Sequence, residues 1–105
     1  MPQIIIRNVQ QHELASVAQD LVEELAQLTG SPADYFSVEL LHTTVISKSE
    51  IYPMVQINWF KRTQAIQDKV AKVIDKYLRE LGYSQIDVYF VILQEHAYYD
   101  NGDHY

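Results

Sequence analysis

The sequence contains no cysteine, and it has only three glycines and three prolines among 105 residues. The lack of cysteine excludes disulfide bonds, thiolate metal sites and a cysteine nucleophile. The scarcity of glycine and proline, together with 48% hydrophobic and 21% charged residues, argues against a disordered or fibrous chain. A chain of 105 residues allows one compact core, so we expect a single folded domain over residues 1–105.

Basic residues are also few, eight against fourteen acidic ones, and the formal net charge is −6. Binding to the phosphates of nucleic acid depends on clustered cations, so a nucleic-acid partner is not expected. No apolar run approaches the roughly 18 residues of a membrane span, and the apolar start at Ile4–Ile6 is too short for a signal peptide. We expect a cytoplasmic protein without a membrane partner.

The spacing of apolar residues predicts two successive βαβ units. The first comprises a strand, a helix and a strand, at Ile4–Ile6, Gln11–Leu28 and Tyr35–Ile46. The second has the same order, with a strand at Pro53–Phe60, a helix from its cap at Thr63 to Leu81, and a strand at Ile86–Leu93. In the tail, Asn101-Gly102 predicts a small hairpin whose tyrosines line a pocket or pack at a subunit contact.

The two units indicate an internal duplication, with repeats at about 1–47 and 52–105. Pro2 and Pro53 lie 51 residues apart, and Gly30 and Gly82, each at the end of a predicted helix, lie 52 apart. We expect a four-stranded sheet with two helices on one face. A ferredoxin-like fold has the same element order and is the alternative, but its parallel pairs flank an intervening strand.

Two helices cover only one face of such a sheet. Ile4–Ile6 and Val88–Leu93 are apolar at consecutive positions, and therefore on both faces. Because large exposed apolar patches are rare on monomers, other subunits are the expected cover. The alternative is an open face with scattered apolar residues.

Pro2 is the first candidate for chemistry. If Met1 is removed, Pro2 carries a terminal secondary amine, which is a suitable general base. With Met1 attached, the same nitrogen is an amide that cannot accept a proton. The alternative is that Pro2 merely begins a strand, where its missing N–H costs little.

Lys61-Arg62 is the second candidate, an adjacent basic pair just before the second predicted helix. Two cations beside the free N–H groups of a helix N-terminus suit a carboxylate or phosphate. The alternative is a solvated loop. No metal site is expected, because the four histidines lack metal-binding spacing: His12, His42, His96 and His104.

The sequence resembles the tautomerase superfamily, which includes 4-oxalocrotonate tautomerase and macrophage migration inhibitory factor. The resemblance covers the whole chain. It rests on the Met-Pro start, the duplicated unit, the segment Thr29–Tyr35 after the first helix and the run Asp87–Phe90. The sequence also resembles an uncharacterised branch of this superfamily in Phe36–Leu40, Tyr52-Pro53, Trp59-Phe60, and the ending Ala97–Tyr99 with Asn101-Gly102.

The resemblance implies a tautomerase-like homotrimer with active sites at subunit contacts and no cofactor. By this resemblance Pro2 is the proton-transferring base, Tyr89 contacts the substrate carbonyl, and Arg62, beside Lys61, holds a carboxylate. Ser31 stands where a lysine is expected. The implied function is tautomerisation of a small 2-oxo acid. The alternative is a non-catalytic trimer that binds a small anionic ligand or a protein partner.

Overall fold

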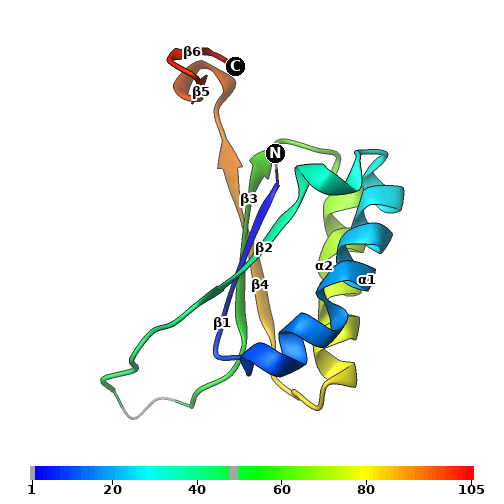
Figure 1. Ribbon diagram of the computed structural model, residues 1–105, viewed down its shortest axis with the longest axis vertical. Coiled ribbons are helices and arrows are strands. Elements are labelled where there is room, and N and C mark those ends of the chain that lie inside the picture. Colours follow the sequence, from blue (N-terminus) through cyan, green and yellow to red (C-terminus); the bar gives the residue numbers. More distant parts are fainter. Residues whose placement is uncertain (1, 48–49) are drawn as a thin grey trace.

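The computed structural model describes residues 2–47 and 50–105, and Figure 1 shows two helices packed on one face of a sheet. The elements of the first repeat are β1 (Gln3–Arg7), α1 (Gln11–Thr29), the 3₁₀ turn η1 (Ala33–Tyr35) and β2 (Ser37–Leu41). Those of the second are β3 (Met54–Phe60), α2 (Gln64–Glu80) and β4 (Asp87–Leu93). The tail forms η2 (Glu95–Ala97), β5 (Tyr99–Asp100) and β6 (Asp103–His104).

The main sheet has the strand order β2-β1-β3-β4. β1 is parallel to β2, β3 is parallel to β4, and the central pair β1 and β3 is antiparallel. The two strands of each repeat are therefore neighbours, which excludes the ferredoxin-like alternative. The predicted four-stranded α/β fold of duplicated βαβ units is confirmed.

Equivalent hydrogen bonds mark the duplication. Ser37 N donates to Pro2 O at 3.2 Å, and Asp87 N donates to Pro53 O at 3.1 Å, so each proline begins the first strand of its repeat beside the second. Gly30 and Gly82 follow the two helices with positive φ values of 71° and 105°, a conformation in which a side chain would be strained.

The core lies between the sheet and the helices. Val55, Ile57 and Trp59 alternate along β3 toward the helices and are at most 1% exposed. Leu25 of α1 and Ile74 of α2 cover them from the other side, both completely buried. Packing of this kind fixes the register of β3 against β1, since a shift of one residue would expose the apolar face.

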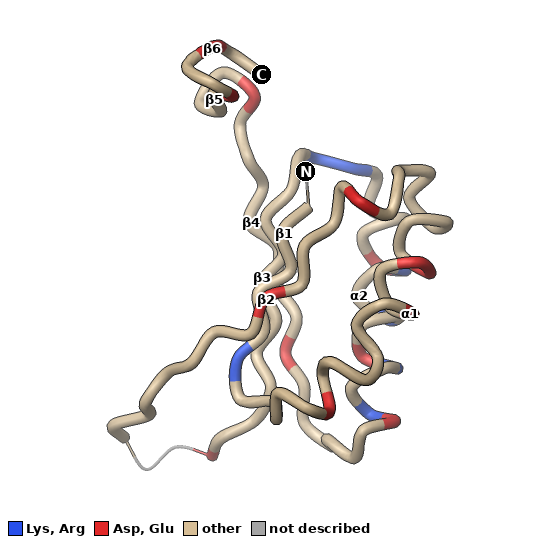
Figure 2. The backbone as a smooth tube through the Cα atoms, viewed as in Figure 1, with Lys and Arg blue, Asp and Glu red and all other residues tan. Residues whose placement is uncertain are grey.

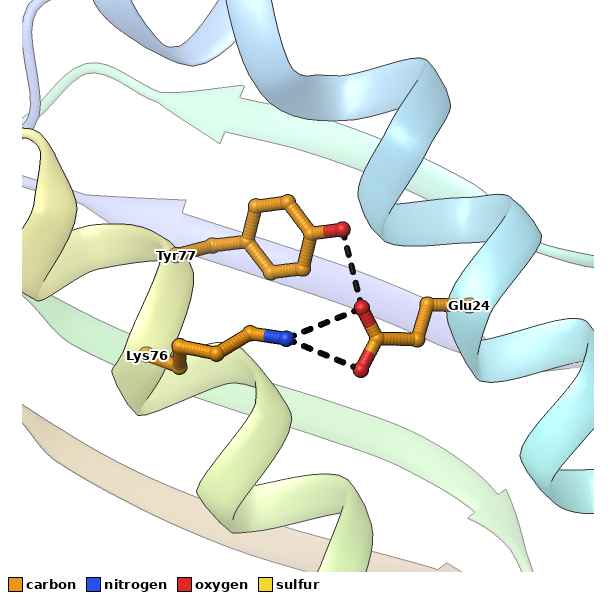
Figure 3. Close-up of polar contacts among 3 residues, drawn as sticks. All are labelled: Glu24, Lys76 and Tyr77. Carbon is orange, nitrogen blue, oxygen red and sulfur yellow. Dashed lines mark hydrogen bonds and ion pairs between the residues drawn. The ribbon is translucent and has the colours of Figure 1, made fainter.

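The helices are also joined by a polar contact (Figure 3). Lys76 Nζ donates to both carboxylate oxygens of Glu24 at 3.0 and 3.1 Å, and Tyr77 Oη donates to one of them at 3.0 Å. Hydrogen bonds from Lys76 and then Tyr77 lower the pKa of Glu24 below its usual value. This contact braces α1 against α2 at the surface.

In the described part of the chain, both helices lie on one face of the sheet and the opposite face carries none. Ile5, Tyr89 and Val91 are apolar or aromatic residues on it, but β3 contributes polar ones. A hydrogen-bonded chain crosses this face, in which Tyr89 Oη donates to Gln56 (2.8 Å), Gln56 to Asn58 (2.9 Å) and Asn58 to Gln3 (3.2 Å). The open face is therefore mixed in character.

Most predicted element boundaries agree with the structure, including the Thr63 cap, whose Oγ1 accepts from Ile66 N at 3.3 Å. The tail hairpin is present, and Asn101 and Gly102 have positive φ values of 53° and 86°. The predicted strand Tyr35–Ile46 is wrong at both ends. Tyr35 lies in η1, and β2 ends at Leu41 because its neighbour β1 ends at the paired residue Arg7.

Among the described ranges, no helix is long and apolar enough to cross a membrane.

Candidate active site

A cleft of about 250 Å³ opens at the end of the sheet where the central strand β1 begins and the central strand β3 ends. Both repeats and the tail contribute to it. Its lining residues are Pro2, Ser31, Tyr35, Trp59, Phe60, Lys61, Arg62, Glu95 and Tyr105. Figure 2 shows the basic segment between β3 and α2 at the same end of the sheet as the N-terminus.

The antiparallel register of β1 and β3 brings Pro2 to the basic pair. Gln3 pairs with Asn58, so the residue before β1 lies beside the last residues of β3. Lys61 and Arg62 follow β3 directly and precede the N-cap of α2. Residues that are about sixty positions apart in sequence therefore share one cleft, and Arg62 reaches the Pro2 cleft within the fold.

Arg62 lies over an aromatic side chain. Its guanidinium carbon is 5.2 Å from the ring centroid of Trp59, a cation–π distance. Its Nε is buried and has no hydrogen-bond acceptor among the residues that the structure describes. Trp59 itself is 1% exposed and stacks on Phe90 with ring centroids 4.9 Å apart. Packing against Trp59 thus positions the Arg62 guanidinium, and its Nε–H remains available to a hydrogen-bond acceptor.

An aromatic cluster forms another wall. Tyr105 stacks on Phe60 at 4.6 Å between centroids, and Tyr98 meets both rings edge-on at 5.3 and 5.4 Å. These contacts attach the tail hairpin, which extends beyond the end of β4 in Figure 1, to the end of β3. The tail tyrosines therefore pack within their own chain, and Tyr105 lines the cleft.

Three of the four predicted site residues, Pro2, Lys61 and Arg62, come together in this cleft. Tyr89 does not line it. It lies on the open face of the sheet, 37% exposed, with its hydroxyl engaged by Gln56. Tyr89 is therefore separated from this cleft within its own chain.

The sequence pattern does not identify Trp59 as a site residue, but the structure places it in the cleft lining. Its indole Nε1 is buried and, within the described part of the chain, has no hydrogen-bond acceptor. The alternation of β3 places Trp59 on the core face, but nothing in a strand pattern shows whether the indole N–H is paired. Glu95, in the turn after β4, brings a carboxylate to the same cleft.

A second hollow, of about 390 Å³, lies at the other end of β1 and includes Asn8, Gln10, His42 and Ile51. No group of three His, Asp or Glu residues in the described ranges could hold a metal ion there or elsewhere. The cleft at Pro2 differs in combining a chain-terminal strand, cations and unpaired donors.

A family model described as "Domain of unknown function (DUF1904)" matches residues 1–104. The chain belongs to this family. A comparison with curated proteins gives no match.

Two solved structures are similar to this chain over nearly its whole length. A protein of unknown function from Vibrio cholerae is 36% identical, with a TM-score of 0.92 over 99% of this chain and 87% of that one. A DUF1904 domain from Sebaldella termitidis is 25% identical, with a TM-score of 0.90 over the full length of both chains.

More distant structures establish the fold. A macrophage migration inhibitory factor-like protein from Entamoeba histolytica is 13% identical, with a TM-score of 0.74 over 99% of this chain and 98% of that one. A fused 4-OT described as an asymmetric trimer is 14% identical, with a TM-score of 0.81 over 97% and 94%. The resemblance to the tautomerase superfamily is thus confirmed, and at these identities it is a likeness of fold.

Proposed function

We propose that this DUF1904 protein is a cofactor-independent tautomerase that acts on a small 2-oxo acid. The observation that carries the proposal is the shared cleft of Pro2, Lys61 and Arg62 at the head of a central strand of a tautomerase fold. Removal of Met1 would turn the buried Pro2 nitrogen into a secondary amine next to two cations. A neutral amine and an anion site then lie within reach of one small molecule.

The reaction needs only proton transfer. The Pro2 nitrogen takes a proton from C3 of the substrate, the C3–H electron pair forms the C2=C3 double bond, and the carbonyl π electrons move to the 2-oxo oxygen. That oxygen takes a proton from water to give the enol, and the prolinium returns its proton to solvent. Arg62 and Lys61 hold the carboxylate and orient C3 toward the amine.

We also propose that the protein acts as a homotrimer. Support comes from the sheet face without helices, where Ile5, Tyr89 and Val91 face outward, and from the fused 4-OT relative, which is described as a trimer. Covering this face would remove apolar area from water. It would also bring Tyr89 to a subunit contact.

The test uses purified protein whose N-terminus is defined by intact mass. Met1-free protein should exchange the C3 hydrogens of 2-oxobutanoate for deuterium in D₂O, observed by proton NMR. Protein that retains Met1 should not, because its Pro2 nitrogen is an amide. Equal exchange by both forms, or by neither, would exclude Pro2 as the base, and binding without exchange would favour the non-catalytic trimer.

A variant tests the anion site separately. Arg62→Ala should weaken 2-oxobutanoate binding by about 1.5–3 kcal/mol, the range for a hydrogen bond to a charged group. Lys72→Ala, an exposed position in the middle of α2, is the matched control and should bind as the parent does. Unchanged binding by Arg62→Ala, measured by calorimetry, would show that Lys61-Arg62 is a solvated loop.

A further inference from the structure

Two buried N–H donors in the cleft lack acceptors. Trp59 Nε1 and Arg62 Nε have no hydrogen-bond partner among residues 2–47 and 50–105, although both side chains line the same hollow. Buried donors are almost always paired in folded proteins, so two orphans in one place require an explanation. A bound molecule that carries acceptors would supply the missing partners.

We propose that Trp59 Nε1 donates a hydrogen bond to the 2-oxo oxygen of the substrate while Arg62 binds the adjacent carboxylate. This inference rests on the proposed function and assigns the specificity of that site. Indole and guanidinium nitrogens donate and do not accept, so the ligand must present acceptors to both. A 2-oxo acid does so with oxygens on neighbouring carbon atoms.

The placement of the indole supports this assignment. Trp59 follows Asn58, the partner of Gln3, and therefore lies on the strand next to Pro2. Stacking on Phe90, at 4.9 Å and 24°, fixes the ring in the core. The guanidinium carbon of Arg62 lies over the ring, 5.2 Å from its centroid, and both residues line the same cleft.

A preset donor at this position has a chemical consequence. When Pro2 removes the C3 proton, negative charge develops on the 2-oxo oxygen, and a fixed N–H stabilises that charge without reorganisation. A simple carboxylic acid would satisfy Arg62 and leave Trp59 unpaired. Trp59 is therefore a specificity-determining residue that favours 2-oxo acids over acids without the carbonyl.

Trp59 can donate to the substrate carbonyl, a contact that Tyr89 cannot make within its own protomer. The Tyr89 hydroxyl is on the other face of the sheet and already donates to Gln56 at 2.8 Å. A neutral donor for the carbonyl oxygen within the cleft is thus available from β3 itself.

The decisive experiment uses the single tryptophan of the sequence, which gives one indole resonance in a ¹H–¹⁵N NMR spectrum. Met1-free protein is titrated with 2-oxobutanoate and, as the matched ligand, with butanoate. The indole N–H should shift on binding 2-oxobutanoate and stay nearly unchanged on binding butanoate. Equal shifts, or no shift when 2-oxobutanoate binds, would overturn the assignment.

Variants give an independent measurement. Trp59→Phe should weaken 2-oxobutanoate binding about tenfold (about 1.4 kcal/mol) and leave butanoate binding unchanged. Tyr77→Phe, which removes a polar group on α2 away from the cleft, is the control and should keep the preference. A Trp59→Phe protein that folds and keeps the preference would refute the proposal, and the NMR titration decides the case if that variant does not fold.

These outcomes separate this inference from the proposed function. An indole shift without deuterium exchange at C3 would keep the Trp59 assignment and reject the tautomerase. Exchange at C3 with an unmoved indole resonance would keep the tautomerase and reject Trp59. Failure of both acids to bind at millimolar concentration would overturn the Trp59 assignment, whatever the exchange result.

Discussion

Glu95 is a single residue that opposes the positive charge of the cleft, because its carboxylate lies in the hollow that holds Lys61 and Arg62. A carboxylate favours a protonated amine at Pro2, whereas the two cations favour the neutral amine. We expect the cations and burial to prevail and to keep the pKa of the Pro2 amine below its reference of about 7.7–8.0. The amine would then be largely unprotonated near neutral pH.

Glu95→Gln should therefore lower the pKa of the Pro2 amine, and the rise of activity with pH should move to lower pH. The measurement is an NMR titration of the terminal proline in Met1-free protein, combined with a pH–rate profile for C3 exchange. Glu39→Gln, an exposed carboxylate on the open face of β2, is the control and should leave both curves in place. An upward shift in Glu95→Gln, or a parent pKa above about 8, would contradict a tuned base.

The sequence predicts some of these residues better than others. Pro2 and the Lys61-Arg62 pair are found because a proline directly after Met1 and an adjacent basic pair are unusual locally. The proposed role of Trp59 is not visible in the sequence, since it depends on contact with Arg62 and on an indole N–H that finds no acceptor among the described residues. The position of Tyr89 depends on the pairing of β3 with β4, which brings its hydroxyl to Gln56.

At the scale of elements, α1 begins without a side-chain cap of its own, because Gln10 makes no capping hydrogen bond. Tyr83, in the loop after α2, replaces it. Its hydroxyl accepts from Gln10 N at 3.1 Å and donates to Glu13 at 2.9 Å. Glu13 occupies the third helical position, so the phenol is inserted between the two partners of a capping box. Burial is the main cause that raises the pKa of Tyr83 above its usual value.

Tyr83→Phe should destabilise the fold by about 1–2 kcal/mol, since it removes both hydrogen bonds and leaves the start of α1 uncapped. Urea unfolding followed by circular dichroism measures the change. Tyr99→Phe, on the exposed tail hairpin, is the control and should have little effect. A Tyr83→Phe protein as stable as the parent would show that water replaces the phenol.

The ends of the helices can be predicted from the sequence because local signals determine them, such as Gly30 after α1 and the Thr63 cap before α2. Strand ends depend on partners. β2 stops at Leu41 although apolar residues continue to Ile46, because β1 has no residue left to pair. This dependence on a neighbour is the physical reason why the predicted strand was too long.

For the whole molecule, stability depends on pH through the brace between the helices. The folded state lowers the pKa of Glu24, so this contribution is present above the unfolded pKa of about 4.3 and disappears as pH falls through the folded value. Glu24 is 36% exposed, which limits the effect to about 1 kcal/mol or less.

Glu24→Gln should therefore be less stable than the parent at pH 7 by up to about 1 kcal/mol, and the difference should shrink at pH 3. Urea unfolding at both pH values measures it. Glu23→Gln, at the neighbouring exposed position, is the control. A difference that grows toward pH 3 would contradict the sign of the pKa shift.

Assembly is the second property of the whole molecule. Sedimentation equilibrium at micromolar concentration should give three times the 12.2 kDa chain mass. Val91→Glu, which places a charge on the open face at a position that is 40% exposed, should release folded monomers. Glu80→Gln, on the exposed end of α2, should remain trimeric. If the parent protein is monomeric, the proposed trimer and its covered sheet face are contradicted.

The brace has one more consequence. Glu24 and Lys76 lie 52 residues apart, the same separation as Gly30 and Gly82, so the ion pair joins equivalent positions of the two repeats. In a symmetric dimer of identical half-length chains, each such position would face its own copy and like charges would meet. The attraction between Glu24 and Lys76 requires the two repeats to carry different residues at this position, and a chain that contains both repeats allows that difference. The same freedom lets the halves contribute different residues to the cleft, Pro2 from the first and Lys61 and Arg62 from the second.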